Sequence, residues 1–324
     1  MNKINIALVG ATGLVGTMFL KILEENNLNI GNIRLFASKK SKGKKIKFLN
    51  QYYEVEELDL SSFDNTDFIF FSAGKDVSSK YALIAEKKGI VIDNSSCFRQ
   101  EKDIPLVVPE INFSDIDLTK RKLIANPNCS TIQCVMCLNV IKKLYHLNKI
   151  VYSTYQAVSG SGTKGIFDYQ SSLEGYPKEF YPYDISKNCI PQIGDIKENN
   201  FSEEENKMIL ETRKILHLPF LEVYSTCVRV PICYGHGVSV YVETEEDIEI
   251  DKIISLMKNS KGIVYQEIPL TENINNNDVY VGRIRKCSHN SLMFYCTSNN
   301  IRKGAAGNAF QIIKKIIEEN LLFK

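Results

Sequence analysis

Up to about Lys149 the chain alternates short apolar runs with stretches in which apolar residues recur at helical spacing. Continuous apolar runs suit strands buried on both faces, and a spacing of about 3.6 residues suits amphipathic helices. The pattern predicts strands at 4–9, 33–37, 68–71 and 90–92, and helices at 14–25, 78–87 and 131–144. This β-α-β rhythm is typical of a doubly wound parallel sheet, the α/β class.

Beyond Lys149 the strand-like runs become longer. The pattern here predicts strands at 150–157, 223–230, 238–243, 279–284 and 292–297, with helices at 203–216, 251–258 and 304–322. Long strands interrupted by a few helices favour a largely antiparallel sheet. We therefore expect a second domain of the α+β type.

Composition and charge restrict the class of protein. A chain of 324 residues is long enough for two domains with sizeable cores. A formal charge of +2 argues against nucleic acid or an anionic membrane as the main partner, and no stretch is long and apolar enough to span a bilayer. The nine cysteines are scattered and odd in number, so we expect reduced thiols and a cytoplasmic protein.

The glycines of GATGLVG lie between the first predicted strand and the first predicted helix. Gly10, Gly13 and Gly16 lack side chains, so the backbone there can approach a pyrophosphate, and the helix N-terminus supplies N–H groups. In the first strand-turn-helix unit this pattern indicates a Rossmann-type dinucleotide site. The alternative is a tight turn packed under a helix.

The end of the second predicted strand indicates which dinucleotide is bound. NAD sites usually have an acidic residue there to hold the ribose 2′-hydroxyl, whereas this strand ends in FASKKSKGKK. Ser38, Lys40 and Ser41 suit a 2′-phosphate instead, so we expect NADP. The alternative is that residues 39–47 form a solvated basic loop without a ligand.

Cys129 stands in NPNCST, just before the helix predicted from residue 131. A thiol at a helix N-terminus has its thiolate stabilised by the helix dipole and the free amides, and the same amides can hold an oxyanion. Cys134 and Cys137 fall on the apolar side of that helix, so we interpret them as core residues. Cys129 is therefore the candidate nucleophile.

His236, in CYGHG, follows Arg229 by seven residues. An arginine in an apolar strand needs an anionic partner. A substrate carboxylate is one candidate, and an internal Asp or Glu is the other. The cysteines and histidines form no paired ligand motif, so we expect no metal.

Several motifs together resemble one family, the aspartate-semialdehyde dehydrogenases. They are GATGLVG, DNSSCFR, NPNCST, QAVSGSG, EENKMILETRKIL, RVPICYGH and RKGAAGN, in the family's order from residue 10 to residue 308. The resemblance implies an NADP-binding domain at 1–128, a catalytic and dimerisation domain at 129–303, and a C-terminal helix at 304–324 that returns to the first domain. Relatives that reduce acetylglutamyl phosphate place a glycine where this sequence has Asn128.

The resemblance also implies roles for individual residues. Cys129 would be the acylated nucleophile, His236 the general acid/base, and Gln156 the residue that orients the bound intermediate. The other substrate residues would be Arg229 on the α-carboxylate, Glu204 on the amino group, Arg99 and Lys207 on the phosphate, and Asn128 beside the nucleophile. The NADP site would be lined by Gly10, Thr12, Gly13, Leu14, Val15, Ser38, Lys40, Ser41, Ser159, Gly160 and Asn308.

Two positions depart from the family's pattern. Lys40 stands where many members have arginine, which implies a looser contact to the 2′-phosphate. Cys97 replaces a small residue in DNSSCFR, where we expect little effect.

The reaction implied is L-aspartate 4-semialdehyde + phosphate + NADP⁺ = 4-phospho-L-aspartate + NADPH, through a thioester on Cys129. In the cell it would run reductively on aspartyl phosphate, in biosynthesis of lysine, threonine, methionine and isoleucine, with diaminopimelate as one branch. One alternative is a sister reductase such as N-acetyl-gamma-glutamyl-phosphate reductase. A non-enzymatic dinucleotide sensor is disfavoured because the cysteine and the histidine are both present.

The resemblance also implies a homodimer that pairs through the second domain. If one face of its sheet stays apolar and open, two copies can bury that face by twofold packing. Tyr224, Val228, Val240 and Val242 are candidates for this face. The alternative is that the protein's own elements cover it.

Overall fold

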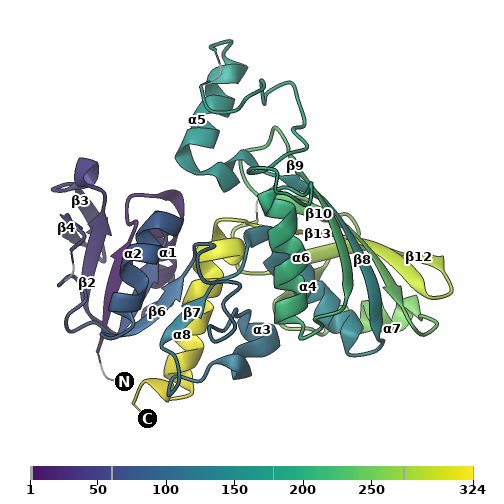
Figure 1. Cartoon of the computed structure of the whole chain (residues 1–324), viewed down its shortest axis with the longest axis horizontal. Coiled ribbons are helices and arrows are strands. Elements are labelled where there is room, and N and C mark those ends of the chain that lie inside the picture. Colours follow the sequence, from purple (N-terminus) through teal and green to yellow (C-terminus); the bar gives the residue numbers. More distant parts are fainter. Residues whose placement is uncertain (1–2, 60, 178, 273, 324) are drawn as a thin grey trace. The chain divides into compact units, whose positions relative to one another are not determined.

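The computed structural model describes residues 3–59, 61–177, 179–272 and 274–323. The chain forms two compact units (Figure 1). Unit 1 comprises Met1–Pro127 and Ala305–Lys324, and unit 2 comprises Asn128–Gly304. Each unit has its own sheet and its own helices.

Unit 1 contains a seven-stranded sheet in the order β3-β4-β2-β1-β5-β6-β7. Its strands are β1 (Ile4–Val9), β2 (Ile30–Ala37), β3 (Lys45–Phe48), β4 (Gln51–Glu57), β5 (Phe68–Phe71), β6 (Ile90–Asp93) and β7 (Leu123–Ala125). Its helices are α1 (Leu14–Asn26), α2 (Lys75–Ala85), α3 (Pro109–Asn112) and α8 (Asn308–Glu318). All neighbouring strands are parallel except β3 and β4, which confirms the doubly wound α/β class.

The strand order of unit 1 reverses between β1 and β5. From β1 the chain continues to β2 on one side, while β5 and β6 extend the sheet on the other. At such a switch point the loops diverge and leave a crevice beyond the carboxyl ends of the strands, where ligands of this fold bind. The glycine turn begins at Gly10, directly after β1.

Residues 39–47 are not all loop, in contrast to the basic loop that we considered as the alternative for this segment. Lys39–Ser41 forms a short 3-10 helix, and β3 begins at Lys45 and pairs antiparallel with β4. The sequence KIKF alternates lysine with apolar residues, so one face of β3 points inward, where Phe48 is fully buried. The many lysines of residues 39–47 make the alternation of inward and outward side chains in β3 hard to recognise from the sequence.

Unit 2 contains a six-stranded sheet in the order β11-β12-β13-β10-β8-β9. Its strands are β8 (Leu147–Gln156), β9 (Glu222–Arg229), β10 (His236–Thr244), β11 (Ile263–Tyr265), β12 (Val279–Ser288) and β13 (Ser291–Ser298). Three of the five pairings are antiparallel, while β8 pairs with β9 and β11 with β12 in parallel. The predicted α+β domain with a largely antiparallel sheet is confirmed.

The helices α4 (Cys129–Lys142), α6 (Glu203–Ile215) and α7 (Ile250–Lys258) pack on one face of this sheet. The helix predicted at 131–144 is therefore correct in place, but it is not amphipathic. Nearly every residue of α4 is buried, because the helix lies between the sheet and the two neighbouring helices. Such a helix is apolar all round.

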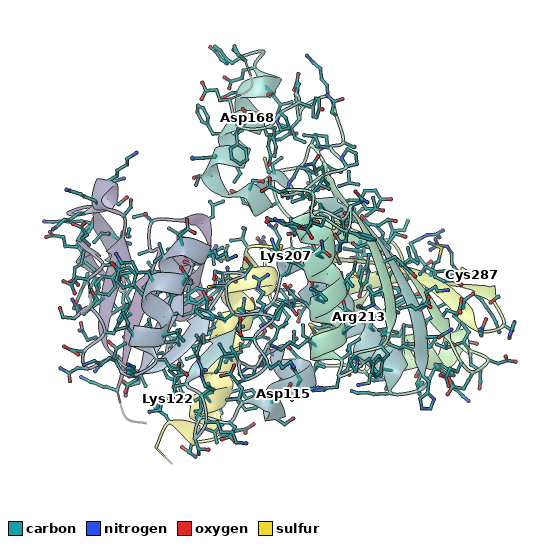
Figure 2. The ribbon with its side chains drawn as sticks, viewed as in Figure 1. Asp115, Lys122, Asp168, Lys207, Arg213 and Cys287 are labelled. Carbon is teal, nitrogen blue, oxygen red and sulfur yellow. The ribbon has the colours of Figure 1, made fainter. Side chains whose placement is uncertain are left out.

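Residues after β8 form a lobe that the sequence analysis did not predict. Its helix α5 (Gly162–Leu173) follows a short 3-10 turn at Val158–Ser161, and the lobe is drawn above β9 in Figure 1. Asp168, labelled in Figure 2, accepts hydrogen bonds from three backbone N–H groups of residues 179–181. These bonds hold the loop after α5 against the helix.

The register of the strands assigns the faces of the sheet. Val228 pairs with Tyr155, whereas Val240 pairs with Tyr152, and residues three apart on a strand point to opposite faces. The prediction that Tyr224, Val228, Val240 and Val242 share one face is therefore wrong. Val240 and Val242 are fully buried on the helix-covered face, while Tyr224 is 48% exposed on the other.

Candidate active site

Cys129 is the first residue of α4, and Asn128 is its N-cap. Asn128 Oδ1 accepts hydrogen bonds from the backbone N–H groups of Ser130, at 2.9 Å, and Thr131, at 3.2 Å. An asparagine cap of this kind stabilises a helix start by about 1 kcal/mol. The predicted position of Cys129 at a helix N-terminus is thereby confirmed.

The amides of Ser130 and Thr131 do not form the oxyanion site that we expected. Their hydrogens are already taken by Asn128 Oδ1, so an oxyanion there would have to displace the cap. The helix dipole still favours a thiolate on Cys129. A developing oxyanion needs a donor from elsewhere in the site.

The other thiols of α4 are core residues, as predicted. Cys134 and Cys137 are fully buried. Burial raises the pKa of both thiols, that of Cys137 well above its usual value. Cys129 is only partly buried, so among these three it is the thiol suited to react.

Three candidate residues form a row across the sheet. His236 on β10 pairs with Gln156 on β8, and Gln156 pairs with Arg229 on β9. Residues in register on adjacent strands point to the same face. The seven-residue separation of Arg229 and His236 in the sequence thus brings them to either side of Gln156.

Glu204, in the first turn of α6, connects this row to the cap of α4. Its Oε1 accepts from Asn128 Nδ2 at 2.8 Å and from Gln156 Nε2 at 3.0 Å. Its Oε2 lies 3.1 Å from the Nζ of Lys207 (labelled in Figure 2). Burial alone would raise the pKa of this carboxyl. The charge of Lys207 and the two donated hydrogen bonds outweigh burial and lower the pKa to about 2.

Arg229 is 4% exposed, and its Nη1 donates to the carbonyl of Ala157 at 2.7 Å. Among the described residues no carboxylate is hydrogen-bonded to it, but the charge of Arg229 helps to lower the pKa of Glu204, so the internal acidic partner that we considered stays an alternative. A Cβ added to Gly160 would lie 2.7 Å from Nη1 and 3.3 Å from His236 Nε2. Only a glycine leaves space there for a ligand group.

His236 is fully buried, and the N–H of Ala157 donates to its Nδ1 at 3.0 Å. No atom in the described part of the chain bonds to Nε2. Burial, followed by the charge of Arg229, lowers the pKa of the ring to about 3.

Three residues of this site were not predicted from the sequence. Glu211, two helical turns after Glu204 on α6, accepts from the backbone N–H of Asn128 at 2.6 Å. Gln133 donates to the His236 carbonyl at 3.2 Å, which ties the helix of the nucleophile to β10. A Cβ on Gly304 would lie 2.7 Å from the Cβ of Cys129. The seven-residue spacing of the two glutamates, which puts them on one helix face, was the signal available.

The glycine turn of unit 1 fits a pyrophosphate. Gly10 has φ +91°, and a Cβ on Gly16 would lie 2.3 Å from the Gly10 carbonyl oxygen, so both positions require glycine. Gly13 is the N-cap of α1, where no side chain caps the helix and no acidic residue occupies the first turn. An anion suits such a helix start.

The end of β2 lies beside this turn, because the N–H groups of Gly10 and Ala11 both donate to the Phe36 carbonyl. Ser38 and Lys40 are exposed just beyond, whereas Ser41 is largely buried. No acidic residue occurs between Ala37 and Lys47. This surface suits the phosphate of a dinucleotide better than a bare ribose hydroxyl.

The remaining predicted ligand residues divide between the units. Thr12, Leu14 and Val15 are partly buried in unit 1. Arg99 of the same unit is buried, and its Nη2 donates to the Asn94 carbonyl. The side-chain amide of Asn308 donates to Val107 and Asn126 in the same unit. Ser159 belongs to unit 2, where its hydroxyl is hydrogen-bonded to Asn300. Their roles toward NADP and phosphate stay predictions.

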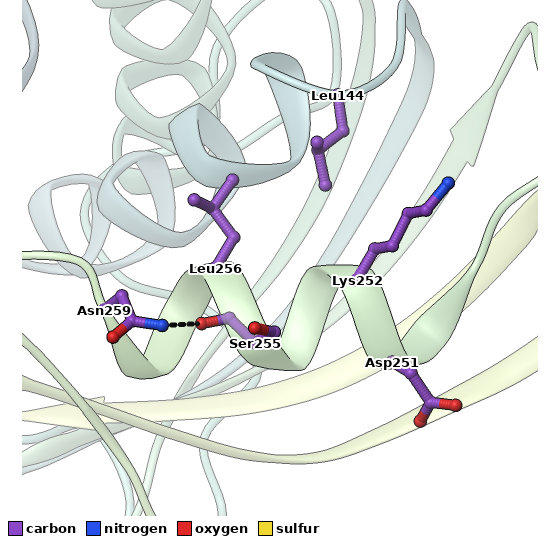
Figure 3. A pocket seen from close by; sticks show the side chains of 6 residues that line it. All are labelled: Leu144, Asp251, Lys252, Ser255, Leu256 and Asn259. Atoms are coloured by element: carbon purple, nitrogen blue, oxygen red, sulfur yellow. Dashed lines mark hydrogen bonds between the residues drawn. The ribbon is translucent and has the colours of Figure 1, made fainter.

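A surface groove of about 490 Å³ lies elsewhere, between α7 and the end of α4 (Figure 3). It is lined by Leu144, Asp251, Lys252, Ser255, Leu256 and Asn259. No candidate site residue lines it. Within the described ranges no group of three or more His, Cys, Asp or Glu side chains is placed to hold a metal, and no helix there is long and apolar enough to cross a membrane.

Comparison with known proteins identifies the family of the chain. Residues 5–119 match the family described as semialdehyde dehydrogenase, NAD binding domain, and residues 138–303 match its dimerisation domain. The class is thus that of oxidoreductases with a nicotinamide-dinucleotide-binding domain.

Individual relatives narrow the class. An aspartate-semialdehyde dehydrogenase of Bacillus subtilis is 42% identical, over 98% of this chain and 99% of that protein. One from Aquifex aeolicus is 41% identical over the same shares. The crystal structure of aspartate semialdehyde dehydrogenase II from Vibrio cholerae has a TM-score of 0.93 at 38% identity, covering 98% of this chain and 99% of that one. The chain belongs to the aspartate-semialdehyde dehydrogenase family.

Proposed function

We propose that this protein interconverts L-aspartate 4-semialdehyde and 4-phospho-L-aspartate, with phosphate and NADP(H), through a thioester on Cys129. The main support for the proposal is the set of hydrogen bonds that links the helix of Cys129 to the other candidate site residues. Asn128 caps the helix of Cys129 and bonds to Glu204, and Glu204 bonds to Gln156 in the row with Arg229 and His236.

The charges of the site support an amino acid as substrate. The buried guanidinium of Arg229 has a planar fork that matches a carboxylate. Glu204 is buried and ionised, which favours a substrate ammonium group over the uncharged amide of an acetylated amine. This difference favours aspartate semialdehyde over the substrate of the sister acetylglutamyl-phosphate reductases. The crystal structure of aspartate semialdehyde dehydrogenase II from Vibrio cholerae complexed with ASA is similar to this chain, with a TM-score of 0.93.

The proposed chemistry divides one difficult step into two easier ones. The Cys129 thiolate attacks the aldehyde carbon and forms a thiohemiacetal, which Gln156 orients. Loss of hydride from that carbon leaves a thioester on Cys129, and phosphate then displaces the sulfur to give the acyl phosphate. The nicotinamide ring, when bound, accepts the hydride. In biosynthesis of lysine, threonine, methionine and isoleucine the sequence of steps runs in reverse.

NADP is proposed over NAD because of the end of β2. Ser38 and Lys40 are exposed there, and the run from Ala37 to Lys47 has no acidic residue to hold a ribose hydroxyl. Arg99 and Lys207 are proposed to bind the substrate phosphate, and Cys129, Asn128 and Gly160 to line the reacting end of the site.

One assay tests the proposed function. Purified protein is incubated with aspartate semialdehyde, NADP⁺ and phosphate, and NADPH is followed by its absorbance. We expect turnover that requires phosphate and that falls by at least tenfold with acetylglutamate semialdehyde in place of aspartate semialdehyde. Equal or faster turnover of the acetylated substrate would assign the chain to the sister reductases instead.

A further inference from the structure

The turn Val158–Ser161 controls the width of the space between Arg229 and His236, because it carries Gly160. A Cβ on Gly160 would lie 2.7 Å from Arg229 Nη1 and 3.3 Å from His236 Nε2. Even a small shift of the turn would therefore change the room left for a ligand. The contacts that fix the turn also fix the width of this space.

The lobe that follows β8 holds this turn through Tyr181. The hydroxyl of Tyr181 donates to Ser161 Oγ at 3.0 Å and lies 3.4 Å from the carbonyl oxygen of Val158. The ring packs against a small apolar core formed by Val158, Ile185 and Ile190. Burial raises the pKa of Tyr181, so the hydroxyl keeps the hydrogen that it donates.

Asp168 on α5 (Figure 2) fixes the backbone that carries Tyr181. Its Oδ1 accepts from the N–H groups of Glu179 and Phe180 at 2.5 and 3.1 Å, and its Oδ2 accepts from that of Tyr181 at 3.1 Å. Burial alone would raise the pKa of this carboxyl, but the three hydrogen bonds lower it below its usual value. The group is therefore ionised at neutral pH and accepts from all three donors.

The lobe is attached to both elements that border the space. α5 approaches the turn at Gly165, where a Cβ would lie 2.6 Å from the Val158 carbonyl oxygen and 2.7 Å from the Tyr181 hydroxyl. So close a contact leaves no room for the lobe to slide over the turn. At the end of β9, Ile190 and Arg229 exchange two backbone hydrogen bonds, at 2.9 and 2.8 Å.

We propose that Asp168 and Tyr181 are positioning residues for the substrate. Asp168 orients Tyr181, and the Tyr181 hydroxyl holds the turn so that the space beside Gly160 fits the semialdehyde. The inference rests on the proposed function, because it concerns the same substrate. The helix of Cys129 is capped by Asn128 without the lobe, so loss of the hydroxyl should weaken substrate binding rather than slow the chemical steps.

Hydrogen exchange tests the link between Tyr181 and the turn without reference to any activity. The N–H groups of Val158 and Ser159 donate to backbone carbonyls of the segment before β10, so their exchange reports opening of the turn. Tyr181→Phe removes one hydrogen bond and keeps the ring in the apolar core. Because such a bond shifts an equilibrium by about 2- to 10-fold, we expect both amides to exchange faster by that factor.

Tyr176→Phe is the matched control, since Tyr176 lies in the same lobe and is 64% exposed. This variant should leave the exchange at Val158 and Ser159 unchanged. Unchanged exchange in Tyr181→Phe would overturn the proposal. Faster exchange spread evenly over unit 2 would overturn it too, because that result would mean a general loss of stability.

Kinetics on the same variants supply the second readout. In Tyr181→Phe the KM for aspartate semialdehyde should rise by about 2- to 10-fold, while kcat stays within about twofold of the wild-type value. Tyr176→Phe should change neither constant. A loss confined to kcat would reject a role in positioning the substrate.

A double variant tests whether Asp168 acts through Tyr181. Asp168→Asn keeps one oxygen for Glu179 and Phe180, but its amide group meets the N–H of Tyr181. We expect the KM to rise as in Tyr181→Phe, and the double variant to be no worse than the poorer single variant. Multiplied effects would reject the role of Asp168. If Asp168→Asn does not fold, Tyr181→Phe still decides the role of the hydroxyl.

The two hypotheses fail in distinguishable ways. If the wild-type protein shows no phosphate-dependent turnover of aspartate semialdehyde, the proposed function is wrong, while hydrogen exchange still decides whether Tyr181 holds the turn. If turnover is present and Tyr181→Phe changes neither the exchange nor the KM, the proposed function stands and the positioning role is rejected.

Discussion

At the scale of single residues, the proposed reactivity of Cys129 depends on its neighbours. Asn128 fixes the helix start, and two glutamates hold Asn128: Glu204 accepts from its side chain and Glu211 from its backbone. NPNCST predicts that Cys129 lies at a helix start, which the structure confirms, and its role as the nucleophile stays a prediction. Nothing in the sequence marks Gln133 as buried, because polar residues on helices are usually exposed, and Glu211 is indicated only by its seven-residue spacing from Glu204.

The nucleophile is tested by Cys129→Ala, with Cys134→Ala, five residues further along α4, as the matched control. We expect the first variant to lower kcat by about 10⁴-fold or more, because no other partly exposed thiol of α4 replaces it, and to retain NADP binding. Cys134 is fully buried, so its variant should cost about 1 kcal/mol of stability and keep activity. Mass spectrometry should find the acyl adduct on Cys129. An adduct on Cys134 or Cys137 would refute the assignment.

Arg229 is tested by Arg229→Lys, which keeps the charge and removes the two-pronged contact. Hydrogen bonds to charged groups contribute about 1.5–3 kcal/mol, so the KM for the semialdehyde should rise by about 10- to 100-fold. The KM for NADP should stay within about twofold in the same assay. A change confined to the KM for NADP would mean that Arg229 does not bind the substrate carboxylate.

At the scale of elements, apolar runs in the sequence located most strands well. The strands that were missed are rich in charged residues or very short. β1 and β5 have the predicted bounds because β5 is wholly apolar and β1 is apolar apart from Asn5. β3 alternates lysine with apolar residues, and β7 has only three residues. α5 leaves Phe167 and Leu173 exposed, both at 61%, so its apolar residues do not mark a single buried face.

The turn after β2 is tested by Lys40→Ala, with Lys39→Ala as the control that removes the same charge one residue earlier. Loss of a charge-assisted contact to the 2′-phosphate should raise the KM for NADP by about tenfold and leave the KM for NAD unchanged. The control should change neither value by more than about twofold. Equal effects of Lys40→Ala on both cofactors would contradict a contact to the 2′-phosphate, and so would a wild-type preference for NAD.

The space between Arg229 and His236 gives a further prediction at the end of β8. Gly160→Ala adds one methyl group where a Cβ meets Arg229 Nη1 at 2.7 Å. Arg229 is held by the Ala157 carbonyl, so the methyl occupies the space meant for substrate. We expect the KM for the semialdehyde to rise at least tenfold while the thermal midpoint changes by less than about 3 °C. An unchanged KM would place the substrate elsewhere.

At the scale of the whole molecule, the open face of the unit 2 sheet is the proposed contact of a homodimer. α4, α6 and α7 cover the opposite face, and residues 138–303 match a dimerisation domain. The open face carries Tyr155, 43% exposed, and Tyr224, 48% exposed, together with Val228. Aromatic residues of this kind are enriched in protein interfaces.

Val228 on β9 and Val240 on β10 form a matched pair of sites for testing this proposal. The register of the strands places their side chains on opposite faces of the sheet. Val228→Glu places a charge on the open face and should convert a sedimenting dimer to a folded monomer at micromolar concentration. Val240 is fully buried beneath the helices, and a charge there costs several kcal/mol, so Val240→Glu should unfold unit 2, as seen in the loss of its circular dichroism. A wild-type protein that sediments as a monomer would reject the dimer, and a Val228→Glu protein that stays dimeric would place the contact on another surface.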